Sequence, residues 1–298
     1  MNVAKAVGFL AERFGDLGEN KFTGRIKVDL LENAELDLAN KLHPAYLTEL
    51  EVPEEQVAYA TEFTLLSALA NNVLGGAEGI LTVRLTGGKY CRKIDPRKIK
   101  DTESYYRTGS DEDPMYYVEG NRINILANSA SGNIDVTYRK VPGPLYYLFT
   151  VVEEGTPSTT LFKGTAGEGL SATNDAYNGA VIYNVTNDTY HVVTDYVGAT
   201  LQFTVTAEVA GAPRTFDSGD KIRFLTHDFD LLNLASVEFT LNPSLHETVL
   251  LLTEAAGWAQ TPEVSRRDGA WDKAVASINT LNAKYKEPEV LGTQKQGR

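Results

Sequence analysis

The sequence predicts an α+β fold, in which a helical scaffold and a central antiparallel sheet carry an inserted small β-sandwich or barrel. Hydrophobic residues recur with a helical period at both ends of the chain, and with a period of two over about 56–145. A second β-rich stretch follows Pro142-Gly143-Pro144, a sequence that is rare inside a sheet. We therefore expect a first domain at 1–147, an inserted β-domain at 148–227, returning helices at 228–286 and a flexible tail at 287–298.

Composition and charge narrow the class of protein. The 298 residues are 42% hydrophobic and 23% charged, which is typical of a water-soluble folded chain. The net charge of -12 means that the molecule as a whole repels nucleic acid and anionic membranes. A single cysteine, Cys91, excludes an internal disulfide and cysteine-based metal clusters. Glu12 and Arg13 interrupt the apolar start, and the aliphatic run Val249–Leu252 is too short to cross a bilayer, so we expect neither a secretion signal nor a membrane span.

Helices are expected at the start of the chain. A stripe of apolar residues before Gly15 predicts a helix over 3–14, formed by Val3, Val7, Leu10, Ala11 and Phe14. Thr23 is a suitable N-cap for a second helix, which should end near His43-Pro44. We expect one further helical turn around Leu47 and Leu50, closed by Pro53.

The middle of the chain is expected to form the sheet. Strands at 80–85 and 90–94 flank Gly87-Gly88, and strands at 116–118 and 122–126 flank the tight turn 119–121. Between these hairpins we expect a short helix at 96–106 and an exposed loop at 109–114. A further strand at 134–141 completes this sheet.

The inserted domain and the closing helices follow. Short strands are predicted at 180–185, 190–196, 201–205 and 221–225. Residues 148–230 include 4 basic and 11 acidic side chains, so this part should not bind DNA. A helix is predicted at 244–259, and another begins after Pro262. The apolar face of that last helix is expected to hold Trp271, Val275, Ile278, Asn282 and Tyr285, widened by Ala274 and Leu281.

No motif predicts catalysis, a cofactor or a metal, and we expect a protein that is not an enzyme. The loop Gly164–Ser171 lacks the lysine of a phosphate-binding loop and is interpreted as a turn. His227-Asp228-Phe229-Asp230 and Asp111-Glu112-Asp113 offer metal-type ligands, but without a recognised spacing, and are interpreted as a linker and a solvated loop. The histidines (His43, His191, His227 and His246) have no nucleophile beside them in sequence.

One segment is strongly basic. Between Arg84 and Lys100 the only acidic residue is Asp95, against seven basic ones: Arg84, Lys89, Arg92, Lys93, Arg97, Lys98 and Lys100. Two interpretations stay open, namely contact with a phosphate backbone or an acidic protein, and a simply solvated hairpin and helix. The chain also has 15 tyrosines, which suit half-buried sheets as well as interfaces.

Several segments together resemble the head-to-tail connector, or adaptor, proteins of tailed bacteriophages, including the podoviral tail tubular type. The resemblance covers about residues 1–145 and the closing helices 244–285, whereas the β-module is a departure from it. It is carried by Phe22-Thr23-Gly24-Arg25-Ile26 with the following Asn33–Ala39, by Arg92-Lys93-Ile94-Asp95-Pro96, by Pro114–Leu126 and by Asp135–Pro142.

The resemblance implies a virion structural protein of the neck or tail region, made in the host cytoplasm. Such proteins form a closed ring, twelve-fold in this family, between the portal protein and the tail or nozzle protein. DNA would pass through the lumen without specific binding, which the acidic charge favours, and the tail Glu289–Arg298 could order against the portal. The alternative is a surface- or carbohydrate-binding virion protein that uses exposed tyrosines of the β-domain, namely Tyr177, Tyr183, Tyr190 and Tyr196.

Overall fold

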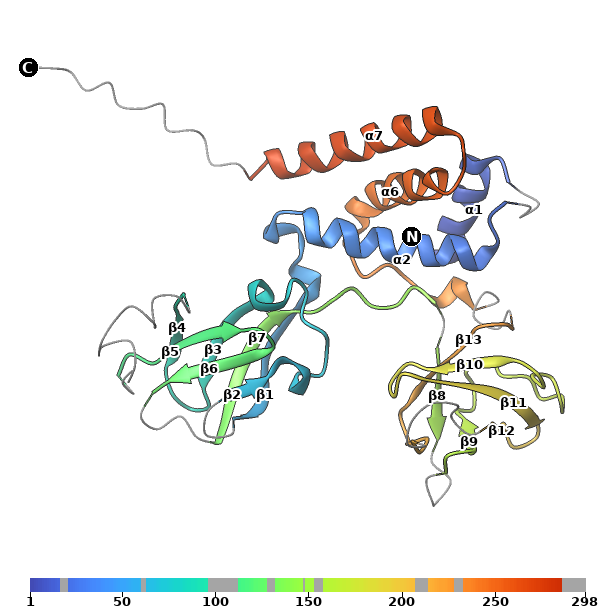
Figure 1. Cartoon of the computed structure of the whole chain (residues 1–298), viewed down its shortest axis with the longest axis horizontal. Coiled ribbons are helices and arrows are strands. Elements are labelled where there is room, and N and C mark those ends of the chain that lie inside the picture. Colours follow the sequence, from blue (N-terminus) through green and yellow to red (C-terminus); the bar gives the residue numbers. More distant parts are fainter. Residues whose placement is uncertain are drawn as a thin grey trace, which may run out of the picture. The chain divides into compact units, whose positions relative to one another are not determined.

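The computed structural model describes residues 1–16, 21–59, 63–95, 112–127, 132–146, 148–152, 158–206, 214–227 and 233–285. It is an α+β structure with both helices and sheets, as the sequence predicts (Figure 1). The chain divides into two compact units, each built from separate segments. The first comprises residues 1–32, 144–239 and 256–262, and the second 33–143, 240–255 and 263–298. The helix expected at 96–106 and the tail expected at 287–298 lie outside the described residues.

The first unit contains the N-terminal helix and an aromatic cluster. Helix α1 (Val3–Phe14) begins at Asn2, whose side chain accepts a hydrogen bond from the amide of Lys5, and ends at Gly15 in the left-handed conformation. Phe14, at the end of α1, packs 4.5 Å from the ring of Phe22 and 5.4 Å from that of Trp258. The predicted helix over 3–14 is thus confirmed.

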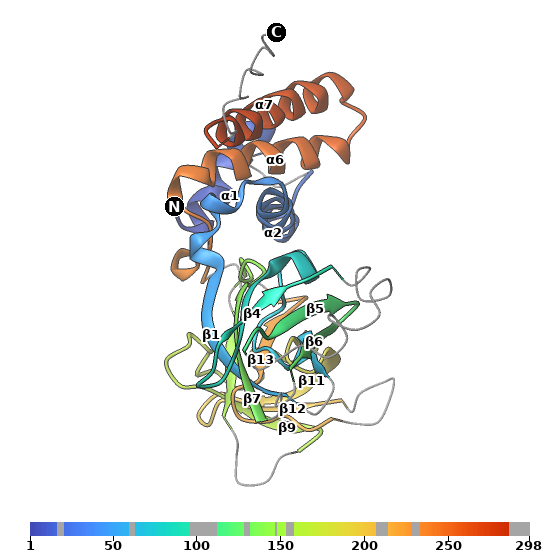
Figure 2. The same ribbon diagram turned by 90° about the vertical axis from the view of Figure 1, so that its left-hand side faces the viewer.

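The first unit also contains a closed six-stranded barrel, which decides between the sandwich and barrel alternatives (Figures 1 and 2). Its neighbouring strands are all antiparallel. Phenylalanine and tyrosine rings fill the core, including Phe149, Phe203 and Tyr196. In spatial order the strands are β10 (Val181–Asn184), β11 (Thr189–Val197), β12 (Gln202–Val205), β9 (Leu161–Gly164), β8 (Phe149–Val152) and β13 (Lys221–Phe224).

The first part of helix α2 (Gly24–Lys41) is joined to this barrel by polar contacts. Arg25 donates hydrogen bonds to the backbone oxygens of Phe224 and His227 at the end of β13. Arg223 forms an ion pair with Asp29 at 3.1 Å. Arg25 and Asp29 are four residues apart and therefore lie on one face of α2, so this face of the helix holds the last strand of the barrel.

The second unit contains an open seven-stranded sheet. All its strand pairs are antiparallel except β4 with β5. One face carries the hydrophobic core, which includes Val83, Ile123 and Val136. The order is β1 (Glu51–Tyr59), β7 (Gly132–Arg139), β3 (Ile80–Leu85), β4 (Tyr90–Lys93), β5 (Met115–Glu119), β6 (Arg122–Leu126) and β2 (Phe63–Leu65). Both predicted hairpins, β3–β4 and β5–β6, are confirmed.

Strand β1 begins earlier than the sequence predicts. The expected turn around Leu47 and Leu50 is present as two 3-10 turns, η1 (Pro44–Tyr46) and η2 (Thr48–Leu50), but Pro53 does not close it. The chain is already in β1 at that point, and the register with β7 shifts between Val52 and Glu55. A bulge on an edge strand tolerates proline because no ladder hydrogen bond is lost there. Glu54, beside it, has a φ of 44°.

The closing helices are α6 (His246–Ala259), which follows the 3-10 turn η6 (Pro243–Leu245), and α7 (Val264–Ala283). Both confirm the predicted helices. Among the described residues, no helix is long and apolar enough to cross a membrane. The remaining 3-10 turns are η3 (Leu66–Ala68), η4 (Gly76–Gly79) and η5 (Leu234–Ser236).

The buried face of α7 agrees with the prediction at Ala274 and Ile278 and differs from it at Trp271 and Val275. Ala270, Ala274 and Ile278 are its buried residues, whereas Trp271 and Val275 are exposed. The small alanine side chains allow a close approach to the rest of the unit, which turns the bulky residues outward. The end of α7 is fixed by Asn282, whose side chain donates to the oxygen of Lys41 and accepts from the amide of His43.

Candidate functional site

The basic hairpin β3–β4 is paired with carboxylates in the described structure. Lys89 forms an ion pair with Glu112 at 2.5 Å, and Arg92 one with Asp113 at 2.9 Å. Lys93 donates to the backbone oxygen of Ala77. Arg97, Lys98 and Lys100 lie outside the described residues. Glu112 and Asp113, which the sequence analysis assigned to a solvated loop, therefore contact the basic side chains of the hairpin.

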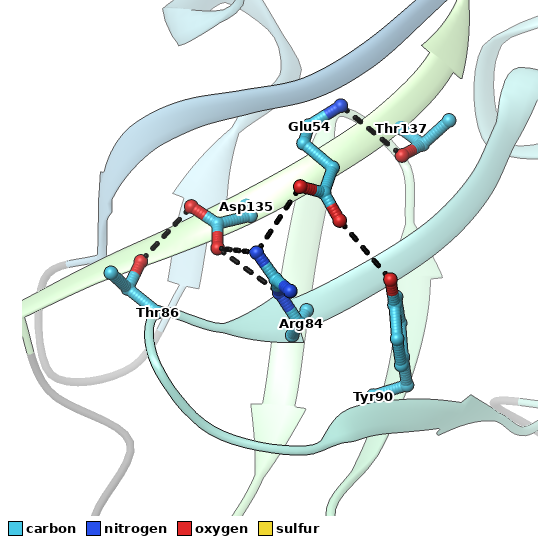
Figure 3. A network of polar contacts seen from close by, with 6 residues as sticks. All are labelled: Glu54, Arg84, Thr86, Tyr90, Asp135 and Thr137. Carbon is cyan, nitrogen blue, oxygen red and sulfur yellow. Dashed lines mark hydrogen bonds and ion pairs between the residues drawn. The ribbon is translucent and has the colours of Figure 1, made fainter.

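Arg84 is the centre of a polar network on the sheet face opposite the core (Figure 3). Its guanidinium group contacts Asp135 of β7 at 2.9 Å and Glu54 of β1 at 3.2 Å. The hydrogen bond that Arg84 donates to the carboxylate of Asp135 is the main reason that the pKa of Arg84 is raised. Acidic partners from two other strands thus hold this arginine, and both are too far away in sequence to be recognised from the local pattern.

The rest of the network fixes the hairpin and the bulge. Tyr90 donates its hydroxyl to Glu54 at 3.1 Å, and Thr86 donates to Asp135 at 3.2 Å (Figure 3). The amide of Glu54 donates a hydrogen bond to the hydroxyl of Thr137. This bond offsets part of the free-energy cost of the left-handed backbone conformation of Glu54. The network links strands β1, β3, β4 and β7, so its geometry suits the positioning of these strands.

The candidate ligands for metals do not come together in the described part of the chain. No group of three or more potential metal ligands is present among those residues, and Asp111, Asp228 and Asp230 fall outside them. His191 and His246 are buried, and their ring nitrogens are hydrogen-bonded to backbone or threonine oxygens.

The two other histidines lie against aromatic rings. His43 stacks on Tyr285 at 4.8 Å, and its Nδ1 accepts a hydrogen bond from the amide of Ala45. His227 lies edge-on to Tyr177 at 4.9 Å. The four histidines are thus used in packing and capping by separate parts of the structure.

Neither the loop Gly164–Ser171, which resembles a phosphate-binding loop in sequence, nor Cys91 is placed for a chemical role. Residues 166–168 form a turn, and the carboxylate of Glu168 accepts hydrogen bonds from the amide and hydroxyl of Thr150. Cys91 is buried under the sheet, and this burial raises the pKa of its thiol to about 11. Since the thiolate is the reactive form, this thiol is a poor nucleophile near neutral pH.

Two of the four tyrosines expected on the barrel surface are in its core. Tyr177 is 3% exposed and Tyr196 is fully buried, so the prediction that they are exposed is wrong. Their rings pack edge-on at 4.7 Å, and the Tyr196 hydroxyl donates to the backbone oxygen of Ser171. The barrel closes over these rings, whereas Tyr190 lies on its outer surface and is 56% exposed.

A line of apolar side chains lies exposed along α7. Val264, Trp271 and Val275 are 53%, 47% and 36% exposed. Their spacing of seven and four residues places them on one face of the helix. Lys41 lies over the ring of Trp271, with its Nζ 5.1 Å from the ring centre. We call these three residues the α7 stripe. The sequence pattern predicted that Trp271 and Val275 are buried. The small side chains of Ala270 and Ala274 were the signal that a different face of α7 packs against the rest of the unit.

No protein-family model matches this chain, and no curated protein matches its sequence significantly.

Proposed function

We propose that this protein is a structural component of a tailed-bacteriophage virion, a head-to-tail connector that assembles as a closed ring between portal and tail. The observation that carries the proposal is the α7 stripe. Three bulky apolar side chains on one helix face remain in contact with water in the single chain. Exposed apolar surface of this kind commonly marks a protein–protein interface.

A second copy of the chain is the proposed occupant of the α7 stripe. The stripe is flanked by charges of both signs, in the ion pairs Arg266–Glu263 at 3.0 Å and Arg267–Asp268 at 2.8 Å. An apolar centre with a polar rim is the usual composition of an interface between subunits. A ring arises when the stripe contacts a different surface of the next copy and the rotation between copies closes.

The charge of the molecule supports the passage of DNA through such a ring. The net charge is -12, and in the described part of the basic hairpin Arg84, Lys89 and Arg92 already contact carboxylates. DNA that moves through a lumen is slowed by attraction to its phosphates, because each neutralised phosphate releases counterions and adds affinity. An acidic wall with paired cations avoids that retention.

The mass of the assembly tests this proposal. Native mass spectrometry of the purified chain, alone and with the portal protein of the same genome, is expected to show a closed oligomer in at least one sample. The double variant Trp271→Gln, Val275→Gln should stay monomeric in both, with unchanged circular dichroism, because it alters only exposed positions of a helix. Leu65→Gln, at an apolar side chain of the sheet that is 42% exposed, is the matched control and should assemble normally.

Two results would contradict the proposal. One is a wild-type chain that is monomeric in both samples, and the other is a double variant that assembles like the wild type. Proteomics of purified phage particles tests the virion role separately, since a connector must be found there in stoichiometric amount.

A further inference from the structure

The outer face of the β10–β11 hairpin carries two stacked tyrosines. Tyr183 and Tyr190 lie directly opposite each other in the register of the two strands. Their rings stack at 4.7 Å with an angle of 28° between the planes. Ile182 precedes Tyr183 in β10, so its side chain lies on the opposite face of the strand. Ile182 is fully buried in the barrel core, and the two tyrosines therefore project outward.

The tyrosine pair is held rigidly. Tyr183 donates its hydroxyl to Asp188 at 2.9 Å, and Asp188 lies in the turn of the same hairpin. On its other side, Tyr183 is paired in register with Arg223 of β13, whose guanidinium group lies 3.7 Å from the ring centre of Tyr146. A ring that is already fixed loses little conformational entropy when a ligand stacks on it.

The apolar surface around the tyrosine pair is small. Val181 and Val192 are paired directly beside the tyrosines on the same outer face, and Val192 is 38% exposed. Two residues along a strand add about 7 Å of length to the platform. Four side chains fall well short of the roughly 800 Å² and 20–30 residues that each partner contributes to a stable protein–protein interface. A small ligand or one short stretch of a polymer fits this surface better than a folded protein.

The charge of the barrel region selects the chemistry of that ligand. Residues 148–230 include 4 basic and 11 acidic side chains, and Asp188 lies beside the rings. This charge disfavours phosphate, uronate and sulfate groups, and the cation beside Tyr183, Arg223, is ion-paired with Asp29. An uncharged ligand therefore fits the site better than a nucleic acid or an acidic polysaccharide. The negative face of a tyrosine ring attracts the weakly positive C–H groups of a sugar, while a carboxylate accepts hydrogen bonds from its hydroxyls.

We propose that this outer face is a binding site for an uncharged carbohydrate, with Tyr190 as the stacking surface and Asp188 as the acceptor for sugar hydroxyls. The inference goes beyond the connector role, because ring assembly needs neither residue. It gives the barrel a function of its own, the recognition of a neutral surface polysaccharide.

A glycan array with the full chain tests the site. The array should hold neutral oligosaccharides beside sialylated, uronate-containing and phosphorylated ones, and the wild type is expected to bind neutral members alone. Tyr190→Ser should weaken that binding by about tenfold or more, since it removes the stacking ring. Asp188→Asn keeps a residue that tolerates a φ of 55° and should weaken binding about fivefold through loss of the charged acceptor.

Leu65→Gln serves as the control, because it removes an exposed apolar side chain from the other unit. The site is overturned if the wild type binds no neutral glycan, if it binds only anionic glycans or a protein, or if Tyr190→Ser binds like the wild type at equal thermal stability. Native mass spectrometry of Tyr190→Ser should show unchanged assembly, so a failure of this site and a failure of the connector role give different results.

Discussion

Gly257 shows how closely one residue determines the packing of the first unit. A Cβ atom at this position would lie 2.4 Å from Cζ of Phe14, and a real side chain cannot approach that closely. Phe14 is 2% exposed and packs against Phe22 and Trp258, so its ring has no room to move away. Helix α6 can pass this ring only because position 257 has no side chain.

We predict that Gly257→Ala lowers the free energy of unfolding by about 1–3 kcal/mol, since the added methyl overpacks the core. Gly8→Ala is the matched control: no atom lies within 4 Å of its added Cβ, and alanine is the better helix former by about 0.8–1 kcal/mol. Urea denaturation of both variants measures the two effects. Equal changes in stability would contradict the packing argument.

The β3–β4 hairpin shows, at the scale of an element, how a charged segment is balanced. Its cations contact carboxylates from the loop before β5 and from β1 and β7, although these are distant in sequence. The pairs of Lys89 and Arg92 are at the surface, with side chains 57% and 50% exposed. Exposed ion pairs of this kind contribute about 0–1 kcal/mol each, so they balance charge more than they stabilise the fold.

Removal of the two loop carboxylates is therefore expected to leave the fold intact and to expose the cations. The variant Glu112→Gln, Asp113→Asn should elute from a heparin column at higher salt than the wild type. The double variant Asp195→Asn, Asp272→Asn changes the net charge equally at exposed positions and should elute earlier than the first variant. If both variants elute together, net charge rather than the hairpin controls retention.

The barrel shows, at the scale of the whole molecule, that part of the first unit has a complete core. Its buried residues all lie between Phe149 and Phe224, and its six strands close without an edge. We predict that residues 145–227, produced alone, fold into the same barrel, as domains of about 60 residues or more often do. A well-dispersed heteronuclear NMR spectrum would confirm this, and a collapsed spectrum would show that contacts from outside the segment, such as those of Arg25 and Asp29 of α2, are needed.

Local patterns predicted most elements of the molecule, and long-range contacts account for the errors. Helix α1 and the β5–β6 hairpin have their signals within a few residues, such as Gly120 at its positive φ of 58°. Strands β8 and β9 were not predicted, and they are held by pairing with β13 and β12, which are distant in sequence. The exposed face of α7 and the partners of Arg84 depend on residues far away in sequence.

The two edges of the open sheet are poorly suited to pairing with strands of other chains. The outermost strand β1 is interrupted by a bulge containing Pro53 and Glu54, and the opposite outermost strand, β2, spans only Phe63–Leu65. Long regular edges are templates on which other chains add strands and form aggregates. Because neither edge offers such a template, many copies can be synthesised together without forming cross-β aggregates through this sheet.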